Sequence, residues 1–160
     1  MDVKTILENF HREKNIRQDV IDAIESDREL RVEFVNYFRN NNDREFVLHL
    51  LDKMTSIRKA DANKLSGDSL MFACYILGFH NQVDDCIKIW DAKATDFDTY
   101  CYIDIQLVPF AGVEETISFL KQQNTDKAKK VLEHIEACHK AGDFDNLDEY
   151  YSKDNLPWWV

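Results

Sequence analysis

Apolar side chains recur every three or four residues along most of this chain, and this spacing constrains the fold more than any other feature. The first stripe is Val3, Ile6, Leu7 and Phe10, which share one face of a helix. The 160 residues include only four glycines and two prolines, too few for the many tight turns of a sandwich or barrel of short strands. The sequence therefore predicts an all-α fold.

Later stripes have the same helical period and predict eight to nine helices in total. The segment from Tyr100 to Val108 is expected to be a helix that stops before Pro109, although its aromatic and β-branched content leaves a strand open. The other stripes are Ile16/Val20/Ile24, Leu30/Phe34/Phe38, Phe46/Leu50/Met54, Leu70/Ala73/Cys74/Leu77, Val83/Cys86/Ile87/Trp90, Val113/Ile117/Leu120, Ala128/Val131/Leu132/Ile135 and Phe144/Leu147/Tyr150/Tyr151.

Capping residues mark the expected helix ends. Ser26 and Glu29 have the spacing of a capping box, and Gly78 and Gly142 are placed to end helices in left-handed turns. Side chains that can accept a hydrogen bond from a first-turn N–H predict further helix starts at Asp43, Ser66, Thr95 or Asp96, and Thr125.

Small-residue and glycine pairs suggest that the helices form repeated hairpins. Leu77-Gly78, Ala111-Gly112 and Ala141-Gly142 place glycines 34 and 30 residues apart, a period typical of helical repeats. Each hairpin leaves an apolar stripe that only a neighbouring hairpin covers. We therefore expect one domain over residues 1–160, built from stacked antiparallel hairpins like an α-solenoid, with a weak joint at 57–65 where the period is lost.

Two of these hairpins, residues 66–94 and 125–153, resemble tetratricopeptide repeats. Gly142, Leu147 and Tyr151 stand where that family has a glycine, a small residue and an aromatic residue in its second helix, and Cys86 and Trp90 follow Asn81 in the same way. Leu147 is larger than the family residue, Asn81 replaces the glycine, and the closing proline is missing. The resemblance implies a concave surface that binds proteins or peptides without catalysis.

The composition excludes several classes of ligand and location. A net charge of −10, from 30 acidic and 20 basic residues, repels nucleic acid and attracts a basic protein, although solubility also explains such a charge. Residues 1–10 show no secretory signal, and the longest apolar run, 70–79, is too short to span a membrane. The four widely spaced cysteines suit buried thiols in a reducing compartment, so we expect a cytoplasmic protein.

No pattern of chemically active residues indicates an enzyme or a cofactor. His134, Cys138 and His139 offer two metal ligands on one helix face, but no matching second pair completes a site. Asp104 is a candidate acid or base if it is buried, or a hydrogen-bond partner of a nearby Tyr or Lys. We expect no catalytic residue, no metal and no cofactor.

The expected binding surface is acidic and aromatic, because stacking brings two groups of carboxylates toward one edge. Trp158 and Trp159 follow a proline, and they dock either on their own domain or on a partner. The predicted partner-binding residues are Asp84, Asp85, Asp91, Asp96, Asp98, Tyr100, Asp143, Asp145, Asp148, Glu149, Tyr151, Trp158 and Trp159.

Three functions fit these features. The leading hypothesis is a non-enzymatic inhibitor, similar in general character to small acidic bacterial immunity proteins, that neutralises a basic toxin such as a nuclease. The alternative is a helical-repeat adaptor that binds an extended peptide in its concave groove. The third is a small hydrolase-like enzyme that uses Asp104. The partner's identity and the oligomeric state are left open.

Overall fold

The computed structural model describes residues 1–160 and contains ten α-helices, two short 3-10 helices and no strand. The all-α prediction is confirmed, with slightly more helices than expected. No helix combines the length and the apolar character that crossing a membrane demands. The elements are α1 (Val3–Glu13), α2 (Gln18–Ser26), α3 (Arg28–Phe38), α4 (Arg44–Ala60), η1 (Ala62–Lys64), α5 (Gly67–Gly78), α6 (Asp85–Lys93), α7 (Phe97–Tyr102), η2 (Ile105–Leu107), α8 (Val113–Gln122), α9 (Asp126–Ala141) and α10 (Leu147–Tyr150).

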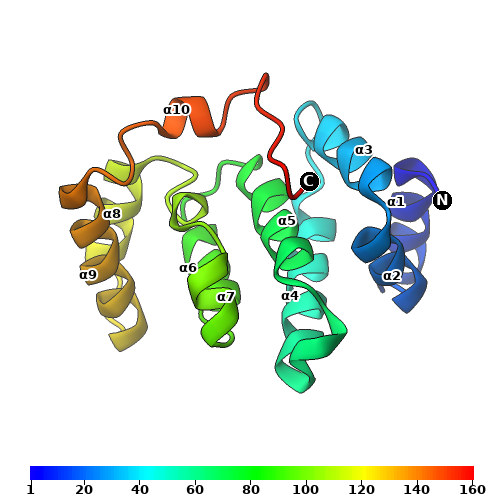
Figure 1. Ribbon diagram of the computed structural model, residues 1–160, viewed down its shortest axis with the longest axis horizontal. Coiled ribbons are helices and arrows are strands. Elements are labelled where there is room, and N and C mark those ends of the chain that lie inside the picture. The colour runs from blue at the N-terminus through cyan, green and yellow to red at the C-terminus, as the bar shows by residue number, and fades with distance from the viewer.

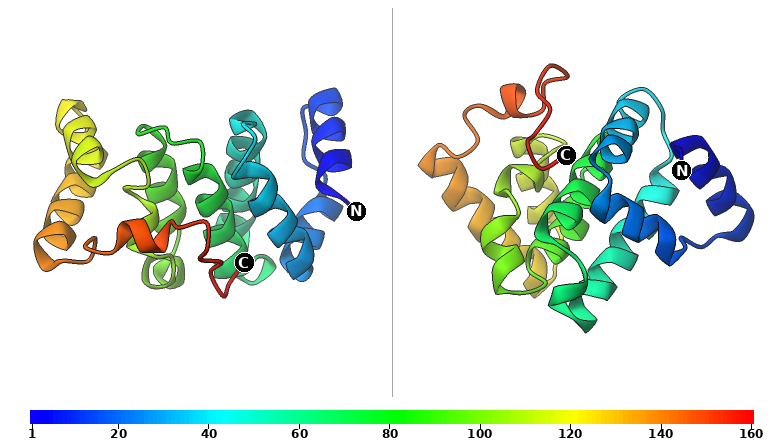
Figure 2. Two further views of the ribbon diagram at one scale, coloured as in Figure 1. Left: turned by 90° about the horizontal axis from the view of Figure 1, so that it is seen from above. Right: turned by 45° about the vertical axis from the view of Figure 1, so that its right-hand side comes forward.

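The helices stand side by side along the long axis of the molecule (Figure 1). Helices α1 to α3 lie at one end and the α8–α9 pair lies at the other, with α4 to α7 between them. The most extensive packing is within the consecutive pairs α4–α5 and α8–α9. The chain after α9 runs back along the row over the upper ends of the helices, so that its last residues lie beside α5 (Figures 1 and 2).

One continuous apolar core joins these helices. Its forty buried residues run from Val3 to Val160 and include side chains from nearly every element. Helix α5 is the centre of this core, because every residue from Ser69 to Gly78 is buried. A helix that is apolar on all sides is expected where neighbouring elements surround it.

Most of the predicted helix ends are confirmed. The side chains of Asp43, Ser66, Asp96 and Thr125 each accept a hydrogen bond from the N–H three residues later. Gly142 ends α9 with a φ of 87°, in the left-handed region that favours glycine.

Two predicted helix ends are wrong. Ser26 still belongs to the last turn of α2 and donates to the Asp22 carbonyl, so Asp27 caps α3 instead. Gly78 remains within α5, and Asn81 adopts the left-handed conformation with a φ of 53°. Gly78 is instead required by packing, because a Cβ there would lie 2.1 Å from a ring carbon of Phe110.

Three segments differ in length from the prediction. Helix α4 continues to Ala60, and the apolar period fades after Ile57 because the buried residue of that turn is Arg58. Helix α7 ends at Tyr102, followed by η2 rather than by a longer helix or a strand. The last predicted helix is reduced to the four residues of α10.

Candidate protein-binding surface

The first predicted group of carboxylates forms ion pairs within the molecule, in which five carboxylates share three bases. Each of its five members lies within 4 Å of a basic side chain, and these bases belong to other helices: Asp84 and Asp85 pair with Arg44, Asp91 with Lys127, and Asp96 and Asp98 with Arg58. Asp85, Asp91 and Asp96 therefore join helix to helix, whereas Asp84 and Asp98 are mostly exposed and lie 3.6 and 3.9 Å from their bases.

Asp85 and Asp96 show the structural role most clearly. Arg44 donates two hydrogen bonds to the buried Asp85, from Nε at 2.9 Å and from Nη2 at 2.5 Å. Hydrogen bonding from Arg58 lowers the pKa of Asp96 to about 2. Removing one partner of such a pair leaves the other charge uncompensated, so breaking either pair would weaken the contacts of α4 with α6 and α7.

The second predicted group is free of ion pairs. Asp143, Asp145, Asp148 and Glu149 are all exposed, and none of them lies within 4 Å of a basic nitrogen. Asp154, which the sequence analysis missed, shares both properties. We call these five residues the C-terminal acidic surface. With Lys153 as the one base between 143 and 154, this stretch carries −4 of the net charge of −10.

Three members of the C-terminal acidic surface, Asp143, Glu149 and Asp154, line a hollow of about 630 Å³. A hydrogen bond from Gln106 Nε2 to the Asp143 carbonyl, at 3.1 Å, holds one of its walls in place. Polar residues from η2, the end of α9, α10 and the tail line it, namely Gln106, Gly142, Asp143, Asn146, Glu149, Tyr150, Ser152, Asp154 and Asn155.

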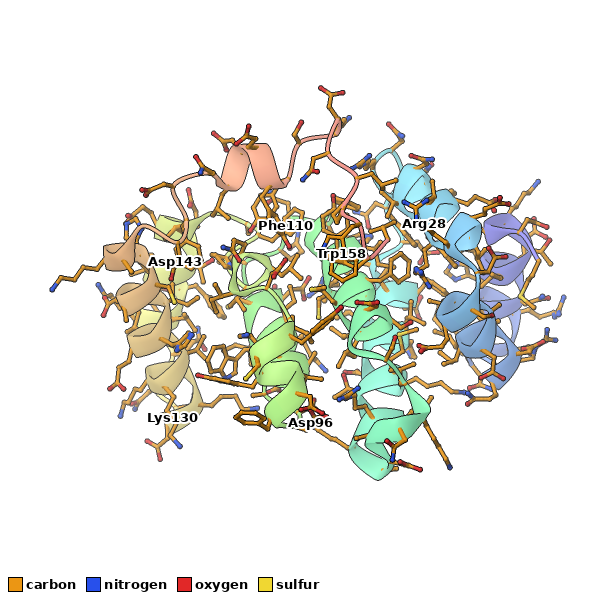
Figure 3. All side chains as sticks on the ribbon, viewed as in Figure 1. Arg28, Asp96, Phe110, Lys130, Asp143 and Trp158 are labelled. Carbon is orange, nitrogen blue, oxygen red and sulfur yellow. The ribbon has the colours of Figure 1, made fainter.

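The structure separates Asp96, of the first group, from Asp143, of the second. Figure 3 shows Asp96 at the lower ends of the helices, midway along the row, and Asp143 near their upper ends, beside α9. The reason lies in the direction of the chain: Asp96 precedes α7, whereas Asp143 follows the long helix α9, which begins near the Asp96 end. The acidic surface whose carboxylates have no cation partner is therefore the C-terminal one.

The predicted aromatic residues also fall into two groups, some docked on the domain and some exposed. Tyr151 stacks on Phe110 at 3.9 Å between ring centroids, and Trp159 is 4% exposed and packs edge-on against Tyr75. Both side chains hold the tail on the domain. Trp158 is 73% exposed and Leu156 is also exposed, so these two place apolar area in the tail that follows Asp154. Tyr100 lies on α7, away from this surface, and is 40% exposed.

The residues considered for catalysis or metal binding have structural partners. Asp104 accepts a hydrogen bond from the Tyr150 hydroxyl at 2.8 Å, and burial, together with this carboxylate, raises the pKa of Tyr150. His134 packs against Trp90 with 5.1 Å between ring centroids, and burial lowers its pKa. No three His, Cys, Asp or Glu side chains are grouped to hold a metal ion.

Comparison with known proteins adds no family to this description. No protein-family model, no curated protein and no solved structure matches the chain. The resemblance to tetratricopeptide repeats stays a prediction, and the functional argument depends on the surface itself.

Proposed function

We propose that the chain is a protein-binding module that captures a basic partner on the C-terminal acidic surface. The observation that supports this proposal is the difference between the two acidic groups. The first group is paired with Arg and Lys of the same chain, whereas the five C-terminal carboxylates have no cation partner, and three of them line a hollow.

Such a surface suits a protein ligand. Carboxylates concentrated on one face speed the encounter with a basic partner and fix its orientation. Binding that relies on charge alone is weak, because exposed ion pairs contribute little. Trp158 is an exposed side chain of the kind found at energetic hot spots, and Leu156 adds exposed apolar area. The most concrete form of this function is an inhibitor that covers the nucleic-acid-binding surface of a basic toxin such as a nuclease.

The test is capture of basic proteins by the immobilised chain over a salt gradient. We expect retention at about 50 mM salt that is lost by about 500 mM, because screening shortens the range of exposed charges. The triple variant D145N/D148N/E149Q should bind the captured partner at least about tenfold more weakly, because it removes three carboxylate charges that each add modestly to the binding energy.

A matched control removes the same charge elsewhere. The variant E8Q/D22N/D126N changes three exposed carboxylates on α1, α2 and α9, and should bind like the wild type. If both triple variants weakened binding equally, the effect would come from the net charge alone, which would contradict the proposed surface. Capture that is indifferent to salt would favour a peptide-binding adaptor instead.

A further inference from the structure

Helix α7 presents an unusual amount of apolar surface to solvent. Six large hydrophobic side chains are exposed in the whole chain, and three of them belong to this six-residue helix: Phe97 at 80%, Tyr100 at 40% and Tyr102 at 40%. Tyr100 leans on Trp90, at 6.1 Å between ring centroids, whereas Phe97 has no aromatic neighbour. Tyr100 therefore lies on another side of the helix from Tyr102, which packs against Gly67. We call Phe97 and Tyr102 the α7 face. Exposed apolar side chains beside polar ones are typical of interaction sites.

The α7 face adjoins a hollow at the start of α5. The hollow has a volume of about 460 Å³, and its walls include Gly67, Asp68, Asp98, Cys101 and Tyr102. Phe97 lies one helical turn before Cys101, so it shares a helix face with a residue that lines the hollow. The surface thus combines an apolar platform with a polar recess.

The recess carries negative charge even though Arg58 also lines it. Arg58 is 7% exposed, and its guanidinium is already engaged by Asp96, at 2.7 Å from Nε, and by the Leu65 carbonyl. The Asp98 side chain is 82% exposed, and its nearest contact with the Arg58 guanidinium is 3.9 Å. Asp68 accepts a hydrogen bond from the Tyr102 hydroxyl. Asp68 and Asp98 both line the recess, and Asp96 already pairs with Arg58, so the recess keeps a net negative charge.

Tyr102 is held in a fixed position as one wall of the recess. Its ring lies against the backbone of Gly67, where a Cβ would come within 2.7 Å of ring carbon Cδ1. Burial and the neighbouring Asp68 raise the pKa of Tyr102 to about 12, so the ring carries a neutral hydroxyl. A neutral aromatic wall beside carboxylates suits a flat cation.

We propose that the α7 face and this recess dock a partner segment that presents an arginine next to an apolar side chain. A guanidinium stacks on an aromatic ring and forks onto a carboxylate, here Tyr102 and Asp98, in ways that an ammonium does not. The adjacent apolar side chain covers Phe97. The negative recess supplies the charge complementarity that selects a basic segment. This surface is distinct from the C-terminal acidic surface and does not rest on the proposed function.

The test uses a defined peptide and the full chain. Acetyl-Leu-Arg-Leu-amide is titrated into the ¹⁵N-labelled protein, and amide shifts are followed by NMR. We expect saturable shifts at Gly67, Asp98, Cys101 and Tyr102. The citrulline peptide, which keeps the shape but lacks the charge, should give no response, and the lysine peptide should bind more weakly.

Three variants locate the effect. D98N should lower the affinity for the arginine peptide about three- to fivefold, the effect of losing one exposed charge pair. F97A should also lower the affinity for the arginine peptide. It should change little the affinity for acetyl-Gly-Arg-Gly-amide, which has no apolar side chain to cover Phe97. D145N/D148N/E149Q should respond like the wild type, because it alters only the other surface. The spectra themselves report whether each variant is folded.

Several results would overturn the inference: no shifts around α7 and the start of α5, equal shifts with the citrulline peptide, or shifts confined to the C-terminal acidic surface. None of these results bears on whether that acidic surface captures a basic protein. Conversely, failed capture by the C-terminal surface leaves the response at α7 intact.

Discussion

His80 is buried in a hydrogen-bonding position that only its neutral form satisfies. Its Nε2 accepts the Asp43 N–H at 3.2 Å, and its Nδ1 donates to the Leu77 carbonyl at 3.2 Å. Burial lowers its pKa below 6.5, while the nearby Asp85 opposes this effect and Arg44 adds to it. Because the unfolded chain takes up the proton first, the stabilisation is complete above about pH 6.5 and is lost as the pH falls toward the folded pKa.

We predict that the variant H80Q lowers the free energy of unfolding by about 1–3 kcal/mol at pH 7.5, the range for a buried hydrogen-bonding group that loses its partner. At pH 5 the difference in the free energy of unfolding between H80Q and the wild type should be smaller, because only the wild type is destabilised by protonation of His80. Urea unfolding at both pH values measures this. H49Q, at an exposed histidine, serves as the control. An equal difference at both pH values would contradict the prediction.

For single residues, contacts with near neighbours in the chain can be predicted from the sequence, whereas ion pairs between distant residues cannot. The caps at Asp43, Ser66 and Thr125 involve backbone groups three residues away, so their roles follow from spacing. The bond between Arg44 and Asp85 spans 41 residues and depends on how α4 and α6 meet. The sequence therefore identified the carboxylates of both acidic groups, but not which group is free of cation partners.

Among the elements, α5 depends on one close approach. Gly78 leaves room for the ring of Phe110, which in turn stacks on Tyr151. We predict that G78A lowers the free energy of unfolding by about 1–3 kcal/mol, the usual effect of overpacking a core.

The double variant isolates the cause of that loss. In an F110A background the ring is gone, so G78A should be neutral or stabilise α5, since alanine is favoured over glycine inside a helix by roughly 0.5–1 kcal/mol. Denaturant unfolding of the four proteins in this cycle gives the coupling. A loss that persists without Phe110 would show that the ring is not responsible.

Long helices with an apolar stripe were predictable, and short ones were not. Helices α1, α4 and α9 have stripes that match their buried residues, because several turns of one periodic face leave little alternative. Helix α7 has six residues and α10 has four, so neighbouring elements decide where they stop. The exposure of the α7 face could not be predicted for the same reason.

At the scale of the whole molecule, the C-terminal segment connects elements that are far apart in sequence (Figure 2). The Tyr151 hydroxyl donates a hydrogen bond to the Gln106 carbonyl. Arg39, at the end of α3, donates to the carbonyls of Lys153 and Asn155, each at 2.9 Å. Trp159 and Val160 complete the connection by entering the core beside α5. The tail thus fixes the last third of the chain to the first.

The two adjacent tryptophans allow stability and binding to be separated. W159A should lower the free energy of unfolding by about 3–5 kcal/mol, because it empties a buried site against Tyr75. W158A should change stability by no more than about 0.5 kcal/mol, since that side chain is mostly in solvent. If Trp158 is a hot spot next to the C-terminal acidic surface, W158A should still weaken capture of a basic partner. Thermal unfolding and capture of both variants test this, and equal destabilisation by the two would show that the tail does not dock through Trp159 alone.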